Sequence, residues 1–404
     1  MTRNMMLLGF AILFAPVLVG AVEITPADSP IKLDLYGVLI ANTYWNSSGV
    51  FGSDVPLWTV AATDPRAGDK ELGMIARQSR FGFKVKGPDV GTAKLSGVFE
   101  MDLFGSMPNG GQKASFAQVR VRLANMKLDW GNASFSAGQD WTILAPLNPT
   151  SLAHFAVVGL ATSGNIWLRY PQVRFEAFAK RGESKFGVTA GMVRPVAGSD
   201  PTEPGSFVDV SGAGERSSMP FLQGRAFYTK TLSEKTIAVG VSMHYGKESY
   251  KFGTTTITRK KVDTWAVAAD FQIPLGKAVG IQGEIFTGTN LDSFQGGINQ
   301  GVSVNESAAD VVTIDATGGW VQLSVTPPQK KELTFHLTYG TDRPDNELLK
   351  AGQRSENSTL MAGLFYKPAA SFQTAVEYAL INTRYRLGKK NDASVLNVAF
   401  AFTF

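Results

Sequence analysis

The feature that most constrains this chain is an alternation of apolar and polar residues that recurs along nearly its whole length. We count about 16 such segments of roughly 10–14 residues each, close to the length with which a tilted strand crosses a bilayer. Side chains alternate between the two faces of a strand, so each segment has an apolar face and a polar face. The segments begin near Ile31, Ile75, Thr92, Ser115, Ala133, Asn165, Lys185, Pro220, Thr236, Val262, Ala278, Gly319, Glu332, Ser358, Phe372 and Ser394. This repetition predicts an all-β chain.

The connections between the segments alternate between short and long. The short ones include 87–91, 129–132, 181–184, 233–235, 275–277, 327–331 and 368–370, and the long ones include 45–74, 141–164, 195–219, 247–261, 290–318 and 342–357. Short periplasmic turns and long extracellular loops are typical of barrels in the outer membrane of Gram-negative bacteria. Strands cross hydrocarbon only as a closed, fully hydrogen-bonded ring. We therefore predict a transmembrane antiparallel β-barrel of roughly 16 strands, with apolar faces toward lipid and polar faces toward a lumen.

The first 21 residues differ in composition from the rest of the chain. Arg3 is followed by an uncharged apolar run from Met5 to Val19 and by small residues up to Ala21, a pattern typical of a cleaved secretory signal peptide. A membrane-spanning anchor is the alternative, but the apolar run is short for one. We expect residues 1–21 to be a signal peptide and residues 22–404 to form a single barrel domain. The final residue, Phe404, is expected at the periplasmic rim.

Aromatic residues fall near the ends of several segments. They include Tyr36, Tyr44, Trp45, Trp130, Tyr339, Tyr366, Tyr378 and Phe404. Aromatic rings suit the boundary between lipid and water, so we expect these residues to form interfacial girdles. The alternative is that aromatic residues are simply common at strand ends.

The composition gives little support to nucleic-acid binding, metal binding or catalysis. The formal net charge is +5 and dispersed, there is no cysteine, and the histidines are His154, His244 and His336. None of them has a His, Cys or carboxylate neighbour at metal-ligand spacing, so we expect no metal and no cofactor. A barrel enzyme remains an alternative and would need a serine within reach of His244 or His336, both of which lie on polar faces.

The candidate functional residues are charged side chains on the polar faces. Arg120 and Arg122, for example, oppose Val119, Val121 and Leu123 in one segment. The basic candidates are Arg80, Lys84, Arg120, Arg122, Arg174 and Arg225, and the opposing acids include Glu100, Asp102, Glu176, Asp270, Glu284 and Glu377. Rings of charged side chains set the selectivity of wide pores, so these arginines predict a preference for anions. Salt bridges that merely fill the barrel are the alternative, and acid–base catalysis by Glu100 and Asp102 is a further one.

The loop 141–164 contains an apolar run, Phe155-Ala156-Val157-Val158. Such a run is poorly suited to hang in water. We expect the loop to fold into the barrel and narrow it, or to pack against a neighbouring subunit.

Three short stretches resemble Gram-negative outer-membrane general porins, and most closely the DcaP-like trimeric porins. They are Ser79-Arg80-Phe81-Gly82-Phe83-Lys84, Ala137-Gly138-Gln139-Asp140-Trp141 and Pro171-Gln172-Val173-Arg174-Phe175. The resemblance implies a trimer of 16-stranded barrels, an inward third loop and uptake of small, often anionic, organic acids. It also implies that Arg80, Gln139, Trp141 and Arg174 lie near the constriction.

Together these observations predict a porin: a water-filled channel for the passive diffusion of small hydrophilic solutes through the outer membrane, with a preference for anionic organic acids. The expected partners are outer-membrane lipid, the solutes and two further copies of the chain. The alternative from another class is a surface adhesin or binding barrel that does not conduct.

Overall fold

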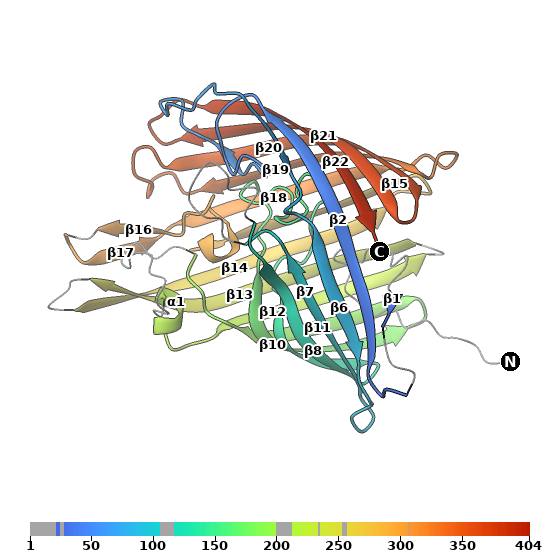
Figure 1. Ribbon diagram of the computed structural model, residues 1–404. Coiled ribbons are helices and arrows are strands. Elements are labelled where there is room, and N and C mark those ends of the chain that lie inside the picture. The colour runs from blue at the N-terminus through green and yellow to red at the C-terminus, as the bar shows by residue number, and fades with distance from the viewer. Residues whose placement is uncertain are drawn as a thin grey trace.

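The computed structural model describes residues 22–24, 28–105, 117–198, 212–232, 235–252, 257–305 and 307–404, and these form a barrel with a tilted wall (Figure 1). The wall strands are β2 (Lys32–Asn46), β5 (Glu71–Ile75), β6 (Arg80–Lys86), β7 (Lys94–Asp102), β8 (Arg120–Asp129), β9 (Ala133–Trp141), β10 (Arg169–Arg181), β11 (Ser184–Val193), β12 (Phe221–Leu232), β13 (Lys235–Phe252), β14 (Thr258–Pro274), β15 (Val279–Thr289), β18 (Asp315–Val325), β19 (Leu333–Pro344), β20 (Arg354–Ala369), β21 (Phe372–Tyr385) and β22 (Asn391–Thr403). The remaining elements are short: β1 (Val22–Glu23), the hairpins β3 (Val50–Phe51) with β4 (Trp58–Thr59) and β16 (Val302–Asn305) with β17 (Asp310–Thr313), helix α1 (Ala213–Arg216) and the 3₁₀ turn η2 (Asp292–Phe294).

The wall closes on itself because β2 pairs with β22 on one side and with both β5 and β6 on the other. Strands β5 and β6 pair with successive parts of β2 and together make the second wall strand. The barrel therefore has 16 antiparallel wall strands, and the predicted fold class is confirmed. Closure leaves no strand edge, which satisfies the backbone hydrogen bonds of a chain surrounded by hydrocarbon.

The outer face of the wall is apolar and its inner face is polar. Large exposed apolar side chains on the strands include Leu39, Phe175, Phe186, Val188, Met243, Ile285, Leu337, Leu380 and Phe400. Fully buried polar side chains at the alternate positions include Asn42, Gln223, Ser242, Gln322, Thr338, Glu377 and Asn397. This is the reverse of a water-soluble protein and matches the predicted orientation of the two faces. Within the described residues, no helix is long and apolar enough to cross a membrane.

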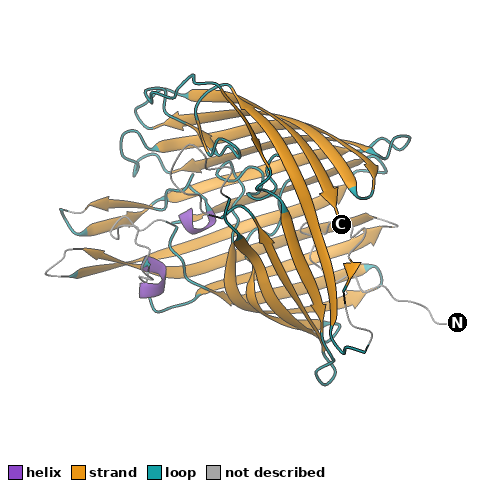
Figure 2. Cartoon of the chain, viewed as in Figure 1, coloured by secondary structure: helices purple, strands orange, loops and turns teal. Residues whose placement is uncertain are grey.

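The prediction of a long connection at residues 247–261 is wrong. Strands β13 and β14 continue through most of it as a paired hairpin, with Lys247 opposite Asp263 and Phe252 opposite Thr258. The hairpin extends beyond the rest of the wall on the loop side (Figure 2). Most of the connection 195–219, like the predicted signal peptide and residues 233–234, lies outside the described residues.

A bulge between β7 and β8 changes which side chains of β8 face inward. Glu100 pairs with Leu123 but Met101 pairs with Val121, so Arg122 is an extra residue on β8. A bulge interrupts the strict alternation of side chains. Leu123, expected on the outer face with Val121, therefore lines the interior together with Asn125 and Lys127.

The aromatic residues named above lie in different places. Trp130 and Tyr366 are exposed near strand ends, whereas Tyr339 and Tyr378 are exposed in the middle of β19 and β21. The side chain of Tyr36 is buried inside the barrel, where its hydroxyl donates to Glu100 Oε2 at 3.1 Å. The difference arises because Tyr36 is at an inward-facing position of β2.

Candidate functional site: the lumen and its inner loop

Residues 142–168, which we call the inner loop, leave the end of β9 and fold into the barrel, as expected from their apolar run. The loop follows the wall, and its backbone N–H groups donate to side chains of successive strands. The acceptors are Gln223 Oε1 for Ile143, Ser242 Oγ for Ala145, Glu284 Oε1 for Leu147, Gln322 Oε1 for Thr150, Glu377 Oε2 for Leu152 and Ala153, and Gln78 Oε1 for Phe155 and Ala156. The lumen is thus crossed by a loop whose polar backbone is satisfied by the wall, as a buried backbone requires.

Three arginines then hold the loop from the opposite side. The inner arginine cluster consists of Arg80, Arg120 and Arg122. Arg80 donates to the carbonyl of Phe155 at 2.8 Å, and both Arg120 and Arg122 donate to the carbonyl of Ala156, at 2.9 and 3.2 Å.

Two buried acids partner this cluster. Arg122 bonds Glu100 at 2.7 Å and Asp102 at 2.9 Å, and Arg120 bonds Asp102 at 2.6 Å. The side chain of Arg122 is 2% exposed and that of Asp102 is 0% exposed. Such charge-assisted bonds fix geometry strongly, so these residues position the loop rather than face open water.

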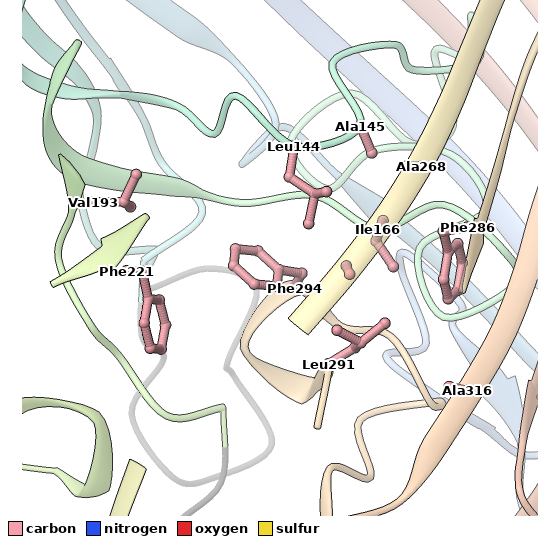
Figure 3. Packing of buried hydrophobic residues seen from close by; sticks show 11 residues of the cluster. Leu144, Ala145, Ile166, Val193, Phe221, Ala268, Phe286, Leu291, Phe294 and Ala316 are labelled. Carbon is pink, nitrogen blue, oxygen red and sulfur yellow. The ribbon is translucent and has the colours of Figure 1, made fainter. Parts of the chain in front are cut away.

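Apolar residues of the inner loop form a buried cluster with the 290–314 loop and the wall. Leu144, Ala145 and Ile166 of the inner loop pack against Leu291 and Phe294 of the 290–314 loop (Figure 3). The cluster also includes Val193, Phe221, Ala266, Ala268, Phe286 and Ala316 of the wall strands or their ends. The backbone N–H of Trp167 donates to the backbone carbonyl of Phe294 at 3.0 Å, which links the two loops directly.

A cavity of about 450 Å³ lies on the other side of the inner loop, toward the short turns. We call it the turn-side cavity. Its walls include Trp141, Ile143 and Leu147 of the inner loop and its base. Its charged lining residues are Lys84, Lys86, Lys127, Arg174 and Arg225 against Asp140, Glu176 and Asp270. Basic side chains therefore outnumber acidic ones around this space.

The arginines of the turn-side cavity are themselves paired. Arg225 bonds both oxygens of Asp270, at 3.0 and 2.6 Å, and Arg174 bonds Asp140. A smaller cavity of about 120 Å³, lined by Tyr36, Arg80, Glu100 and Phe155 among others, lies beside the next part of the inner loop.

The candidate residues of the sequence thus fall into separate places. Arg80, Glu100, Asp102, Arg120 and Arg122 meet around the carbonyls of the inner loop. Lys84, Trp141, Arg174 and Arg225 line the turn-side cavity. Gln139 lines neither cavity: its amide donates to the carbonyls of Val121 and Arg122, at 2.9 and 3.2 Å, at the β8 bulge. Gln139 therefore bonds the backbone at the point where the register of β7 and β8 shifts.

Glu284 and Glu377 also differ from expectation. Both were expected to be acids opposing the arginines across the pore, and both instead accept backbone N–H groups of the inner loop. The glutamines Gln78, Gln223 and Gln322, which do the same, were not among the candidates. The only available signal was an inward-facing Gln or Glu on several strands, and a loop partner cannot be assigned from such a position alone.

Arg169, the first residue of β10, was also missed. Its guanidinium carbon lies 4.7 Å from the ring centre of Trp141 and 5.3 Å from that of Trp167. These residues mark where the inner loop leaves the wall and where it rejoins it, and the Thr142 N–H donates to the Leu168 carbonyl at 3.1 Å across that base. Arg169 is 8% exposed.

The histidines are buried or nearly so, and one has a serine partner. His336 Nδ1 lies 2.8 Å from Ser324 Oγ, across β18 and β19, so the pair that a barrel enzyme would need exists. Among the described residues, no carboxylate bonds the His336 ring, whose other close neighbour is the Phe365 ring at 4.8 Å. No three His, Cys, Asp or Glu side chains of the described chain form a metal-binding group. The absence of catalysis stays a prediction.

His154, in the inner loop, is partly buried. Burial lowers its pKa to about 4, against a smaller opposing effect of Asp54. The imidazole is therefore neutral in the folded protein at ordinary pH, and its Nδ1 has no hydrogen-bond partner within the described structure.

Comparison with known proteins places this architecture among outer-membrane channels of known structure. No protein-family model and no curated protein sequence matches the chain. The outer membrane channel DcaP of Acinetobacter baumannii superimposes with a TM-score of 0.70 at 16% identity, covering 94% of this chain and 99% of that one.

Two further solved structures are similar to a lesser degree. An anion-selective porin from Comamonas acidovorans gives a TM-score of 0.56 at 11% identity, covering 93% of this chain and 100% of that one. The trimer form of OmpT, an outer membrane protein of Vibrio cholerae, gives 0.57 at 14% identity, with coverage of 93% and 100%. The chain therefore has the porin fold, and its resemblance to the DcaP-like porins is confirmed at the level of the fold.

Proposed function

We propose that this chain forms a channel in the outer membrane of a Gram-negative bacterium, through which small hydrophilic solutes diffuse passively. The observation that carries the proposal is the turn-side cavity. It is a space of about 450 Å³ with a charged lining, inside a wall whose outer face is apolar. The inner loop bounds this cavity and is the element that would set the size limit. The porin fold shared with DcaP supports the same function.

A preference for anions is the finer part of the proposal. It is supported by the excess of basic side chains around the turn-side cavity, since charged linings set the selectivity of wide pores. One structurally similar protein is described as anion-selective. The pairing of Arg174 and Arg225 with carboxylates weakens the field that each arginine contributes, so the preference is expected to be modest. Small organic acids are the solutes that this lining would favour.

Three further properties complete the proposal. Residues 1–21 act as a signal peptide and are removed on export, leaving residues 22–404 as one barrel domain. The mature barrel assembles as a homotrimer, as the trimer form of the similar OmpT structure suggests. Large apolar side chains on the outer wall, such as those of Leu39 and Phe400, offer a surface for lipid or for another copy.

The proposal is tested by reconstituting the mature protein in a planar bilayer with a salt gradient. We expect discrete conductance steps and a reversal potential displaced toward the anion equilibrium potential. Liposome swelling with sugars and dicarboxylates then measures the size limit. A cation-selective current would contradict the anion preference, and the absence of steps would contradict the channel itself.

One observation favours a barrel that does not conduct. The inner loop is bonded to the wall at many positions, and the apolar cluster around Phe294 packs against it. An adhesin or binding barrel would give no current in the same bilayer experiment. The Ser324–His336 pair is checked in parallel by assaying ester hydrolysis with His336→Ala.

A further inference from the structure

The base of the inner loop contains a guanidinium whose Nη1 is not hydrogen-bonded by any described residue. Arg169 is more than nine-tenths buried, and its Nη1 has no hydrogen-bond partner within the described structure. No described carboxylate lies within ion-pair distance of it. A guanidinium carries five N–H donors and keeps its charge in proteins. Burying a charge without a partner is strongly unfavourable, so buried charges are normally paired.

The surroundings of Arg169 increase this need for a negative charge. The rings of Trp141 and Trp167 lie beside its guanidinium at 4.7 and 5.3 Å. Arg122 approaches the same Trp141 ring at 5.9 Å. Aromatic faces partly offset a cation, but they accept no in-plane hydrogen bond.

The neighbouring acids are already committed. Glu100 and Asp102 bond the inner arginine cluster. Glu100 and Asp102 thus partner Arg80, Arg120 and Arg122, and no described carboxylate is left to pair with Arg169. The Nε of Arg80 is likewise without a hydrogen-bond partner among the described residues. Positive side chains therefore outnumber negative ones in this region, and a further negative charge would be favourable there.

We infer that Arg169 holds a small anion, of the size of chloride or a carboxylate group, at the base of the inner loop. The anion would accept hydrogen bonds in the plane of the guanidinium, while the two tryptophans cover its faces. It would join the point where the loop leaves β9 to the point where it rejoins β10. This site stabilises the loop, and it does not depend on whether the barrel conducts.

The test uses full-length mature protein refolded in detergent and crystallised with bromide in place of chloride. We expect an anomalous bromide peak beside Arg169 Nη1. In solution, the thermal unfolding midpoint is expected to rise with chloride concentration at constant ionic strength, with gluconate as the balancing anion. A ligand that binds only the folded state stabilises it in proportion to the logarithm of its concentration above its Kd.

Two variants separate this site from general salt effects. Arg169→Met keeps the length and apolar stem of the side chain but removes the charge, and it should abolish both the bromide peak and the chloride dependence. Arg174→Gln, a matched control in the turn-side cavity, should keep both. Arg169→Lys should retain the dependence with a weaker affinity, by about tenfold, because it lacks the planar fork.

Water alone beside Nη1 in the bromide crystals would overturn the inference. So would an equal chloride dependence in the wild type and Arg169→Met. Bilayer conductance is recorded on the same preparations. A conducting channel without the anion would refute this site alone, and a bound anion without conductance would refute only the proposed function.

Discussion

Two groups of arginines point into the same lumen, and their surroundings differ. Arg122 of the inner arginine cluster is 2% exposed and bonds two carboxylates and a loop carbonyl. Arg174, in the turn-side cavity, is 26% exposed and bonds one carboxylate that is itself partly exposed. A buried charge with several partners is costly to remove, whereas a partly exposed ion pair contributes little to stability. The same residue type therefore holds a loop in one place and lines a cavity in the other.

The largest expected effect is that of Arg122→Ala. Removing this guanidinium leaves Glu100 and Asp102 short of a partner in a buried region, which typically costs about 3–5 kcal/mol. Unfolding by heat or denaturant in detergent, followed by circular dichroism, measures the loss. Arg174→Ala is the control and should cost less than about 1 kcal/mol. Equal losses in the two variants would remove the distinction between the two groups.

Acidification should loosen the inner loop through His154. Its pKa in the folded protein is about 4, below the ordinary value of 6.5, so the fold favours the neutral ring. This stabilisation is complete above pH 6.5 and is lost as the pH falls toward 4, with a total of up to about 3 kcal/mol. Unfolding midpoints measured between pH 7.5 and 4 check the effect. In His154→Phe, which cannot take up a proton, this part of the pH dependence should disappear.

The wall acceptors of the inner loop provide a third test. In Glu377→Ala the N–H groups of Leu152 and Ala153 lose their acceptor, at a cost of about 2 kcal/mol. Glu377→Gln keeps an oxygen in place and should cost less than half as much. Hydrogen exchange at these two amides is expected to accelerate in the alanine variant and to change little in the glutamine variant. Unchanged protection in Glu377→Ala would mean that the bond does not hold the loop.

The smallest expected effect concerns selectivity. Arg174→Gln removes one positive charge from the turn-side cavity and leaves Asp140 unpaired, so the ratio of anion to cation permeability should fall by about two- to threefold, since a partly exposed charge is well screened. Reversal potentials in a salt gradient measure the ratio. Lys84→Gln, a second cavity residue, should act in the same direction. If the permeability ratio is unchanged in both variants, the selectivity arises elsewhere, in the inner arginine cluster.

Sequence reasoning placed correctly the residues whose inward direction follows from the local alternation of apolar and polar side chains. Arg80, Arg120, Arg174 and Arg225 face inward because they alternate with apolar neighbours. Gln139 was expected near the constriction from the family resemblance alone, and it instead bonds the carbonyls of Val121 and Arg122. Leu123 was misplaced because one extra residue on β8 shifts the alternation there, and the bulge depends on how β7 and β8 pair. Periodicity within one strand carries no information about such a pairing.

The sequence by itself determined the inside-out pattern of this protein, the number of its wall strands and the side on which its long loops lie. These follow from the period of the side chains and from the need to pair every backbone group in hydrocarbon. Only the tertiary structure decided which side chains hold the inner loop and which face open space. The contacts between Glu377 and Leu152, or between Arg122 and Ala156, join residues far apart in the chain. Such pairs depend on the path of a loop through space, which no short stretch of sequence encodes.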